Sequence, residues 1–238
     1  MNPLWVTWFE TGFNVVYLIL VWWMVVMMTR NMSRVSEKDW PTANLIRISF
    51  ILLAAGDTGH VGFRVLATLM GETGARINLF GEPASLVGIG MLTTAYTVTL
   101  FYMVWVYIWR RRYQQPSGLA VNLLLAAGLF RLIFMALPGN DWGGLVPPQP
   151  MSLYRNIPLF VQGIGLLWLM FDWAYRKQDR VFQWIAWMVV ASFAFYAPVI
   201  FFARQVPMLG MLMIPKTCAY LAIAWIAYRG LWQAKKAV

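Results

Sequence analysis

The sequence predicts an all-α membrane protein in which seven transmembrane helices form one bundle, with residues 1–238 as a single domain. Seven apolar segments are each long enough, at about 1.5 Å per residue, to cross a hydrocarbon core of about 30 Å. The chain is 61% hydrophobic and 12% charged, whereas soluble proteins carry about 25% charged residues. Its basic residues gather in alternate loops, which is typical of a multi-pass protein of the cell membrane.

The seven predicted helices are separated by short polar segments. They span residues 4–29, 44–70, 84–109, 118–137, 154–175, 181–203 and 207–229. The segments NMSRVSEKDWPT, RRRYQQPS and RKQDR join helices on one side of the membrane. On the other side, GETGARINLFGEP joins the second and third helices, and PGNDWGGLVPPQPMS joins the fourth and fifth. The last of these is rich in residues that favour turns. It either folds over the mouth of the bundle as a lid or lies at the surface as a plain loop.

The 19 Lys and Arg residues divide unequally between the two sides of the predicted bundle. Three lie on one side: Arg76, Arg155 and Arg204. Twelve lie on the other: Arg30, Arg34, Lys38, Arg110, Arg111, Arg112, Arg176, Lys177, Arg180, Arg229, Lys235 and Lys236. Because basic loops stay in the cytoplasm, we expect the N-terminus outside and the C-terminus inside. The net charge of +10 is therefore a topology signal helped by anionic lipid, and no nucleic-acid partner is expected.

The third and seventh predicted helices share an internal similarity at an offset of 120 residues. The matching pairs are Gly90/Gly210, Met91/Met211, Leu92/Leu212, Thr97/Thr217 and Trp105/Trp225. A duplication would give a three-plus-one-plus-three arrangement with the fourth helix as the linker, as in membrane transporters built from parallel repeats. Chance likeness between apolar helices is the alternative.

Ionisable side chains lie inside or at the ends of the predicted spans, mostly at mid-membrane or in the outer half. Charges in hydrocarbon are costly, and they usually line a cavity or pair with one another. Asp57, His60 and Arg64 are spaced i, i+3 and i+7, which places them on one helix face. The predicted ligand-binding residues are Glu10, Asp57, His60, Arg64, Arg131, Arg155 and Lys216. Neutral residues at similar depth are Thr93, Thr94, Tyr96, Thr97, Gln162, Ser192 and Tyr196.

The charges in this zone do not cancel, because four basic residues face two acids, Glu10 and Asp57. An anion would balance the remainder, whether a carboxylate, a phosphate or a lipid headgroup, and arginine recognises such groups well. The alternative is an internal ion-pair network that fixes the helix positions and holds only water.

Lys216 lies within PKTCAYLAIAW of the seventh helix, and FAFYAPVIFF precedes it in the sixth. About forty residues here resemble the microbial rhodopsins, and the resemblance implies retinal bound to Lys216 as a Schiff base. Two features of that family are absent. The third helix has no Asp or Glu to act as counterion, and Leu212 stands four residues before Lys216 where the family has Asp. Asp57 or Glu10 would then serve instead, and a plain ion pair between Lys216 and one of these acids, without a cofactor, is the alternative.

His60 is the only histidine and Cys218 the only cysteine. A bis-histidine haem, a CxxC site and an intrachain disulfide are therefore excluded, and no metal is expected. His60 beside Asp57 is a candidate catalytic pair, able to relay a proton or act as a general base. Gly56 and Gly59 of the same GDTGH segment instead favour close helix packing.

The sequence favours a membrane transporter or solute-binding protein for a small anionic or zwitterionic ligand that enters from the outer side. Asp57 and His60 would couple protonation, while Arg64, Arg131 and Lys216 would bind the ligand. Three alternatives stay open: a retinal photoprotein, a membrane-embedded enzyme that acts on a lipid headgroup through Asp57 and His60, and a structural subunit of a homo-oligomer or larger membrane complex.

Overall fold

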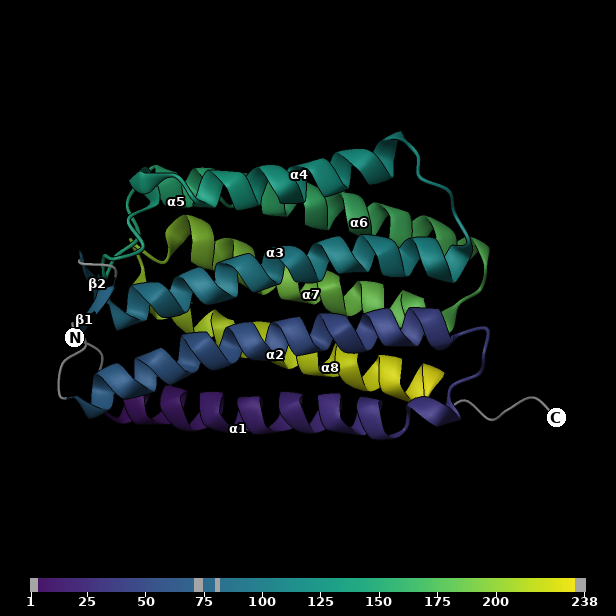
Figure 1. Cartoon of the computed structure of the whole chain (residues 1–238), viewed down its shortest axis with the longest axis horizontal. Coiled ribbons are helices and arrows are strands. Elements are labelled where there is room, and N and C mark those ends of the chain that lie inside the picture. Colours follow the sequence, from purple (N-terminus) through teal and green to yellow (C-terminus); the bar gives the residue numbers. More distant parts are fainter. Residues whose placement is uncertain (1–3, 71–74, 80–81, 234–238) are drawn as a thin grey trace.

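The computed structural model describes residues 4–70, 75–79 and 82–233. The chain forms an elongated bundle whose long helices run side by side (Figure 1). The helices are α1 (Leu4–Arg30), α2 (Trp40–Leu69), α3 (Leu86–Tyr113), α4 (Leu119–Met135), α5 (Met151–Tyr154), α6 (Ile157–Arg176), α7 (Arg180–Phe202) and α8 (Met213–Leu231). Short 3-10 turns are η1 (Met32–Arg34), η2 (Pro138–Asn140) and η3 (Pro207–Leu212).

Six helical segments of the described chain are long and apolar enough to cross a membrane. Helix α4 is apolar but shorter than these six. Its 17 residues extend about 25 Å, slightly less than the thickness of a hydrocarbon core. The prediction of an all-α bundle compatible with a membrane protein is confirmed in this coarse form. Seven crossings and their orientation stay predictions.

Local sequence sets several helix ends. Ser85 caps α3 by accepting a hydrogen bond from the Gly88 amide at 3.4 Å, and α3 ends where Gln114 adopts a left-handed conformation with φ 52°. Asp179 caps α7 by accepting a bond from the Phe182 amide at 3.3 Å. Such caps satisfy amides that have no partner within the helix.

The connection between α2 and α3 contains a feature that the sequence did not predict. Strands β1 (Arg76–Leu79) and β2 (Glu82–Ser85) form an antiparallel hairpin in which Arg76 pairs with Ser85. The amides of Leu86 and Ser85 donate to the carbonyls of Ala75 (3.1 Å) and Gly143 (2.9 Å). The two strands and the start of α3 therefore gain backbone partners that a free loop would lack.

Two predicted helices also begin differently. The fifth span, predicted from residue 154, is divided into α5 and α6. The seventh, predicted from residue 207, opens with the 3-10 turn η3 before α8. The closest helix pairs are α2–α3 and α7–α8, the equivalent pairs of the proposed duplication, which itself stays a prediction.

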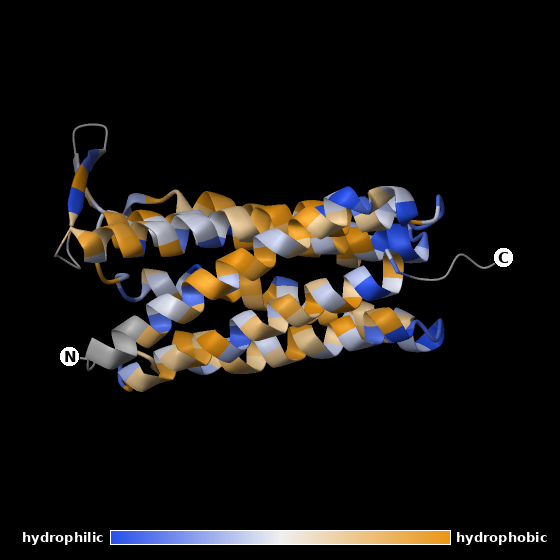
Figure 2. Cartoon of the chain, turned by 90° about the horizontal axis from the view of Figure 1, so that it is seen from below, coloured by the Kyte–Doolittle hydropathy of each residue, from blue (hydrophilic) through white to orange (hydrophobic). Residues whose placement is uncertain are grey.

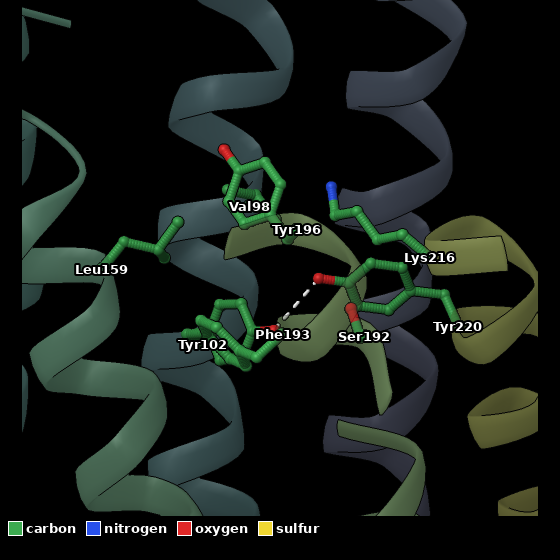
Figure 3. A pocket seen from close by; sticks show the side chains of 8 residues that line it. All are labelled: Val98, Tyr102, Leu159, Ser192, Phe193, Tyr196, Lys216 and Tyr220. Atoms are coloured by element: carbon green, nitrogen blue, oxygen red, sulfur yellow. Dashed lines mark hydrogen bonds between the residues drawn. The ribbon is translucent and has the colours of Figure 1, made fainter. Parts of the chain in front are cut away.

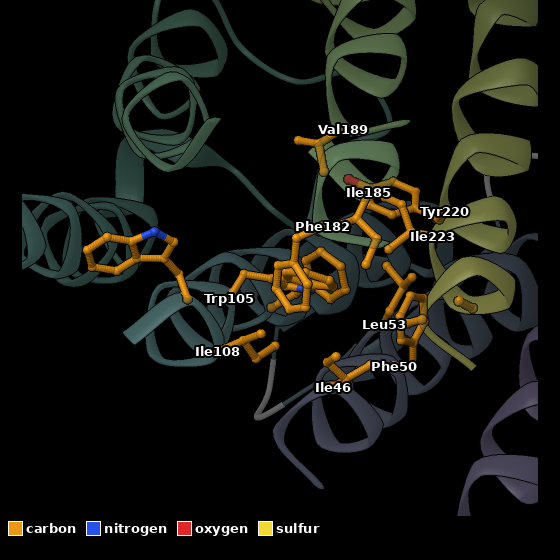
Figure 4. Close-up of a cluster of buried hydrophobic side chains, with 14 of the residues drawn as sticks. Ile46, Phe50, Leu53, Trp105, Ile108, Phe182, Ile185, Val189, Tyr220 and Ile223 are labelled. Carbon is orange, nitrogen blue, oxygen red and sulfur yellow. The ribbon is translucent and has the colours of Figure 1, made fainter. Parts of the chain in front are cut away.

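The two ends of the bundle differ in chemistry (Figure 2). One end, here called the basic end, holds the connections α1–α2, α3–α4 and α6–α7. The opposite end, here called the hairpin end, holds β1, β2 and the α4–α5 connection. Toward the basic end an aromatic and aliphatic core fills the space between α2, α3, α7 and α8 (Figure 4). Phe101 lies within it, edge-on to Phe50 at 5.8 Å and to Tyr220 at 5.5 Å, so this half of the interior is closed.

Arg112 of α3 bonds to residues of the α1–α2 and α6–α7 connections at the basic end. Its guanidinium bonds Asp39 at 2.5 Å and Asp179 at 2.7 Å, and it lies 5.3 Å from the Phe182 ring centroid. Asp39 precedes α2 and Asp179 precedes α7. One side chain of α3 therefore fixes the starts of two other helices.

We expect Arg112→Met to lower the free energy of unfolding by about 1–3 kcal/mol, because two carboxylates lose a charged donor. The matched control is Arg176→Met. Arg176 forms an ion pair with Asp172, but the Arg176 side chain is 70% exposed. Its replacement is therefore expected to lower the free energy of unfolding by about 0–1 kcal/mol. Denaturation of the detergent-solubilised protein, followed by tryptophan fluorescence, measures both. Equal losses would contradict the bridging role of Arg112.

Candidate functional site

Asp57 of α2 points into the bundle, between α1 and α3. Its Oδ2 accepts a hydrogen bond from the Tyr17 hydroxyl at 2.7 Å, and its Oδ1 accepts one from the Thr94 hydroxyl at 3.1 Å. Two neutral donors from two neighbouring helices therefore hold this carboxylate in the interior.

Close approach of α2 and α3 places these groups. A Cβ added at Gly56 would overlap the Thr97 side chain, and one at Gly59 would overlap Thr93. On the facing helix, a Cβ at Gly90 would lie 3.1 Å from the backbone of His60. The packing interpretation of the GDTGH glycines is thus supported, and the same glycines bring Thr94 within reach of Asp57.

Lys216 lies beside a small cavity between α3, α6, α7 and α8 (Figure 3). The lining residues are Val98, Tyr102, Leu159, Ser192, Phe193, Tyr196, Lys216 and Tyr220. The space open to the centre of a water molecule is about 10 Å³, room for about one water. The Lys216 ammonium lies 4.3 Å from the Tyr196 ring centroid and 5.6 Å from that of Tyr220, so aromatic faces stabilise it.

Lys216 and Asp57 attract each other electrostatically but do not form a direct ion pair. The ion pairs of the described residues involve only Arg112 and Arg176. A contact pair of Lys216 with Asp57 or Glu10 was one form of the prediction, and it is not formed here. The other form, a ligand shared between Lys216 and Asp57, stays a prediction.

Arg131 of α4 is 2% exposed and is held by neutral acceptors. It donates to the Arg155 carbonyl at 2.8 Å, to the Ala95 carbonyl at 2.9 Å, to the Thr99 hydroxyl and to Asn156 Oδ1 at 3.4 Å. These bonds join α4 to α3 and to the α5–α6 turn. The structure thus gives Arg131, predicted to bind ligand, a scaffold role as well, since most of its donors are used by the protein.

Arg155, at the α5–α6 turn, is 7% exposed and lies 4.2 Å from the Trp142 ring centroid. Its Nη1 is buried and has no hydrogen-bond partner among the described residues. Trp142 is anchored in turn by a bond from its Nε1 to the Met135 carbonyl at 2.8 Å. The α4–α5 segment therefore packs onto the buried Arg155, as the lid interpretation expects, and Ser85 pairs with its Gly143.

The cationic side chains converge on Tyr196. Its ring contacts Lys216, and the charges of Arg131 and Arg155 both act on its hydroxyl. Within the described structure, neither the Lys216 ammonium nor the Tyr196 hydroxyl has a hydrogen-bond acceptor. Of the three groups, Arg155 Nη1 is the buried polar atom without a hydrogen-bond partner among the described residues, whereas Lys216 and Tyr196 line the small cavity. We call Lys216, Tyr196 and Arg155 the donor cluster.

Glu10, His60 and Arg64 lie on the way from the hairpin end to Asp57. The hydrogen bond between Tyr17 of α1 and Asp57 of α2 shows that these two residues lie at the same height along the bundle. Glu10 and Arg64 are each seven residues nearer the hairpin end, so both lie about 10 Å from that bond along the helix axes. Arg64 shares the Asp57 face but is exposed, whereas Glu10 and His60 are half-buried. This face therefore leads from an exposed end to a buried carboxylate.

The candidate catalytic pair is not assembled. The Asp57 carboxylate is bonded by Tyr17 and Thr94, and His60 Nδ1 is buried without a partner among the described residues. The positive charges of Arg64 and Lys216 also act on His60. An Asp–His dyad for general-base chemistry would require one of these groups to turn.

The neutral residues divide between site and scaffold. Thr94 bonds Asp57, and Ser192 and Tyr196 line the cavity. Tyr96 donates to the Leu132 carbonyl at 3.1 Å, and Gln162 to the Leu124 carbonyl at 3.2 Å, so they join helices. Tyr17, Trp142 and the Tyr102–Tyr220 hydroxyl pair at 3.0 Å were not among the predicted site residues. For Tyr17 a signal existed: it lies seven residues from Glu10, on the same helix face.

The cavity beside Lys216 has room for about one water. Retinal bound to Lys216 stays a prediction. No group of three or more His, Cys, Asp or Glu that could hold a metal ion occurs in the described parts of the chain.

Comparisons with known proteins give no relative: no protein-family model, curated protein or solved structure matches this chain. The functional argument therefore depends on the site itself.

Proposed function

We propose that this protein is a membrane transporter or solute-binding protein for a small anionic or zwitterionic ligand. The observation that carries the proposal is the donor cluster, in which Lys216, Tyr196 and Arg155 present donors without acceptors beside the further positive charge of Arg131. A buried, unpartnered charge is costly. An anion would accept these donors and lower that cost.

Asp57 supports the zwitterionic part of the proposal. Its charge acts on Lys216 without a direct contact, so a ligand with an ammonium group and a carboxylate can bridge the two. Asp57 and His60 lie on one face of α2 and are groups that can exchange a proton. Proton coupling through them is therefore part of the proposal.

The exposed Arg64 and half-buried Glu10 favour entry from the hairpin end, whereas the core around Phe101 closes the basic end. We place the hairpin end outside the cell, because the twelve basic residues of the opposite side fit cytoplasmic loops. Seven crossings, with α4 as the shortest, complete this topology.

The topology is tested with reporter fusions. Fusions after Gln114 and Val238 are expected to report a cytoplasmic position and a fusion after Gln149 an external one, since positive loops remain inside. A cytoplasmic signal at Gln149 would overturn the assignment.

Ligand binding is tested with the purified protein in nanodiscs, titrated calorimetrically with acetate, nitrate and glycine. Binding of at least one anion or zwitterion is expected, together with a higher unfolding temperature at saturating ligand. Acetamide, the uncharged analogue of acetate, is the matched control and should not bind. A protein that binds none of the three and gains a visible absorbance band with added retinal would instead be a photoprotein.

A further inference from the structure

An apolar groove runs along the exposed side of α6. Its volume, open to the centre of a water molecule, is about 580 Å³, within the range of about 300–1,000 Å³ typical of ligand sites. The lining residues are Ala120, Leu123, Leu124, Ile157, Phe160, Val161, Ile164, Gly165, Trp168, Leu169 and Phe201. From Ile157 to Leu169 the helix rises about 18 Å, so the groove is long, and its lining residues are apolar or aromatic.

One end of this groove adjoins the donor cluster. Ile157 lines the groove two residues after Arg155. Phe160 also lines it, and its ring stacks on Tyr196 at 6.3 Å and packs on Phe193 at 5.5 Å. Tyr196 and Phe193 line the cavity of Lys216. A single aromatic ring therefore lies between the apolar groove and the polar cavity.

The two spaces differ in size in a way that constrains the ligand. The groove accepts one extended hydrocarbon chain, whereas the cavity holds about one water. A phospholipid headgroup is far larger than such a cavity, whereas a carboxylate has three non-hydrogen atoms and needs the cavity to widen only as far as a turn of the Phe160 ring would allow. The donor cluster supplies charge complementarity for that carboxylate.

We propose that the ligand is a single-chain amphiphile with a carboxylate head, such as a long-chain fatty acid. Its chain lies in the α6 groove, and its head meets Arg155 and Tyr196, reaching Lys216 when the Phe160 ring turns aside. This inference rests on the proposed function and specifies its ligand class. The groove end beside Arg155 and Ile157 lies toward the hairpin end (Figure 1), so the head of the ligand lies on the side from which the proposed function has it enter.

The test measures binding of radiolabelled palmitate and acetate to the protein in nanodiscs. Palmitate is expected to bind at least about tenfold more tightly, because its chain fills the groove. Val161→Trp, a groove position 53% exposed, should weaken palmitate binding at least about fivefold and leave acetate binding unchanged. The matched control is Leu129→Trp, at an α4 position 54% exposed and outside the groove, which should alter neither.

The outcomes separate this inference from the proposed function. Equal affinity for palmitate and acetate, or no effect of Val161→Trp, overturns the amphiphile and leaves the anion site standing. Displacement of palmitate by phosphatidylglycerol at lower concentration than by unlabelled palmitate overturns it in favour of a phospholipid. If neither anion binds, the proposed function fails first.

Discussion

Lys216→Met is expected to weaken anion binding by about 10- to 100-fold, because a hydrogen bond to a charged group contributes about 1.5–3 kcal/mol. The ammonium of Lys216 has no hydrogen-bond acceptor among the described residues, so the ligand supplies its missing partner. Titration calorimetry with the best-binding anion of the panel measures the loss.

Two further variants separate binding from stability at this position. Lys216→Arg keeps the charge and should retain more affinity than Lys216→Met. Lys216→Met alone leaves Asp57 without its attracting charge, so stability should fall. Adding Asp57→Asn, which removes the negative charge but keeps an oxygen to accept a hydrogen bond, should restore part of the stability but not binding. Unchanged affinity in Lys216→Met would remove Lys216 from the site.

Arg131→Met is expected to lower the free energy of unfolding by about 2–4 kcal/mol, because the Arg155 carbonyl and the Thr99 hydroxyl lose a charged donor in the interior. Arg131→Lys should lose nearly as much, since a lysine ammonium cannot present the guanidinium fork to several acceptors. Thermal unfolding followed by tryptophan fluorescence gives both values.

Arg111→Met is the control, because Arg111 is exposed at the end of α3. This substitution should change the free energy of unfolding by no more than about 0.5 kcal/mol. A variant Arg131→Met that keeps full stability but loses ligand binding would show that Arg131 acts as a ligand residue. Loss of stability with Arg131→Lys, at a site where charge is conserved, would show that the bonds rather than the charge matter.

The sequence by itself determined that the chain folds as an all-α bundle of apolar helices, and it gave the approximate positions of the long ones. Apolar segments of sufficient length have few alternatives to helices in a bilayer, so α1, α2, α3, α6, α7 and α8 could be located to within a few residues. The spacing of Asp57, His60 and Arg64 also placed them correctly on one face, because helical periodicity is a local property. The β1–β2 hairpin was missed, because its strands are only four residues long and its anchor at Gly143 is distant in sequence, so no local periodicity indicates it.

Only the tertiary structure decided which polar groups meet. Lys216 and Asp57 were predicted at one depth, but the helix rotations that set an aromatic face rather than a carboxylate beside the ammonium depend on packing against α3 and α7. The sequence could not show that Arg131 uses its donors on neutral acceptors, because backbone carbonyls carry no sequence signal. The depth of a side chain in the bundle follows from its residue number along the helix. The partner that the side chain meets depends on how neighbouring helices pack against one another.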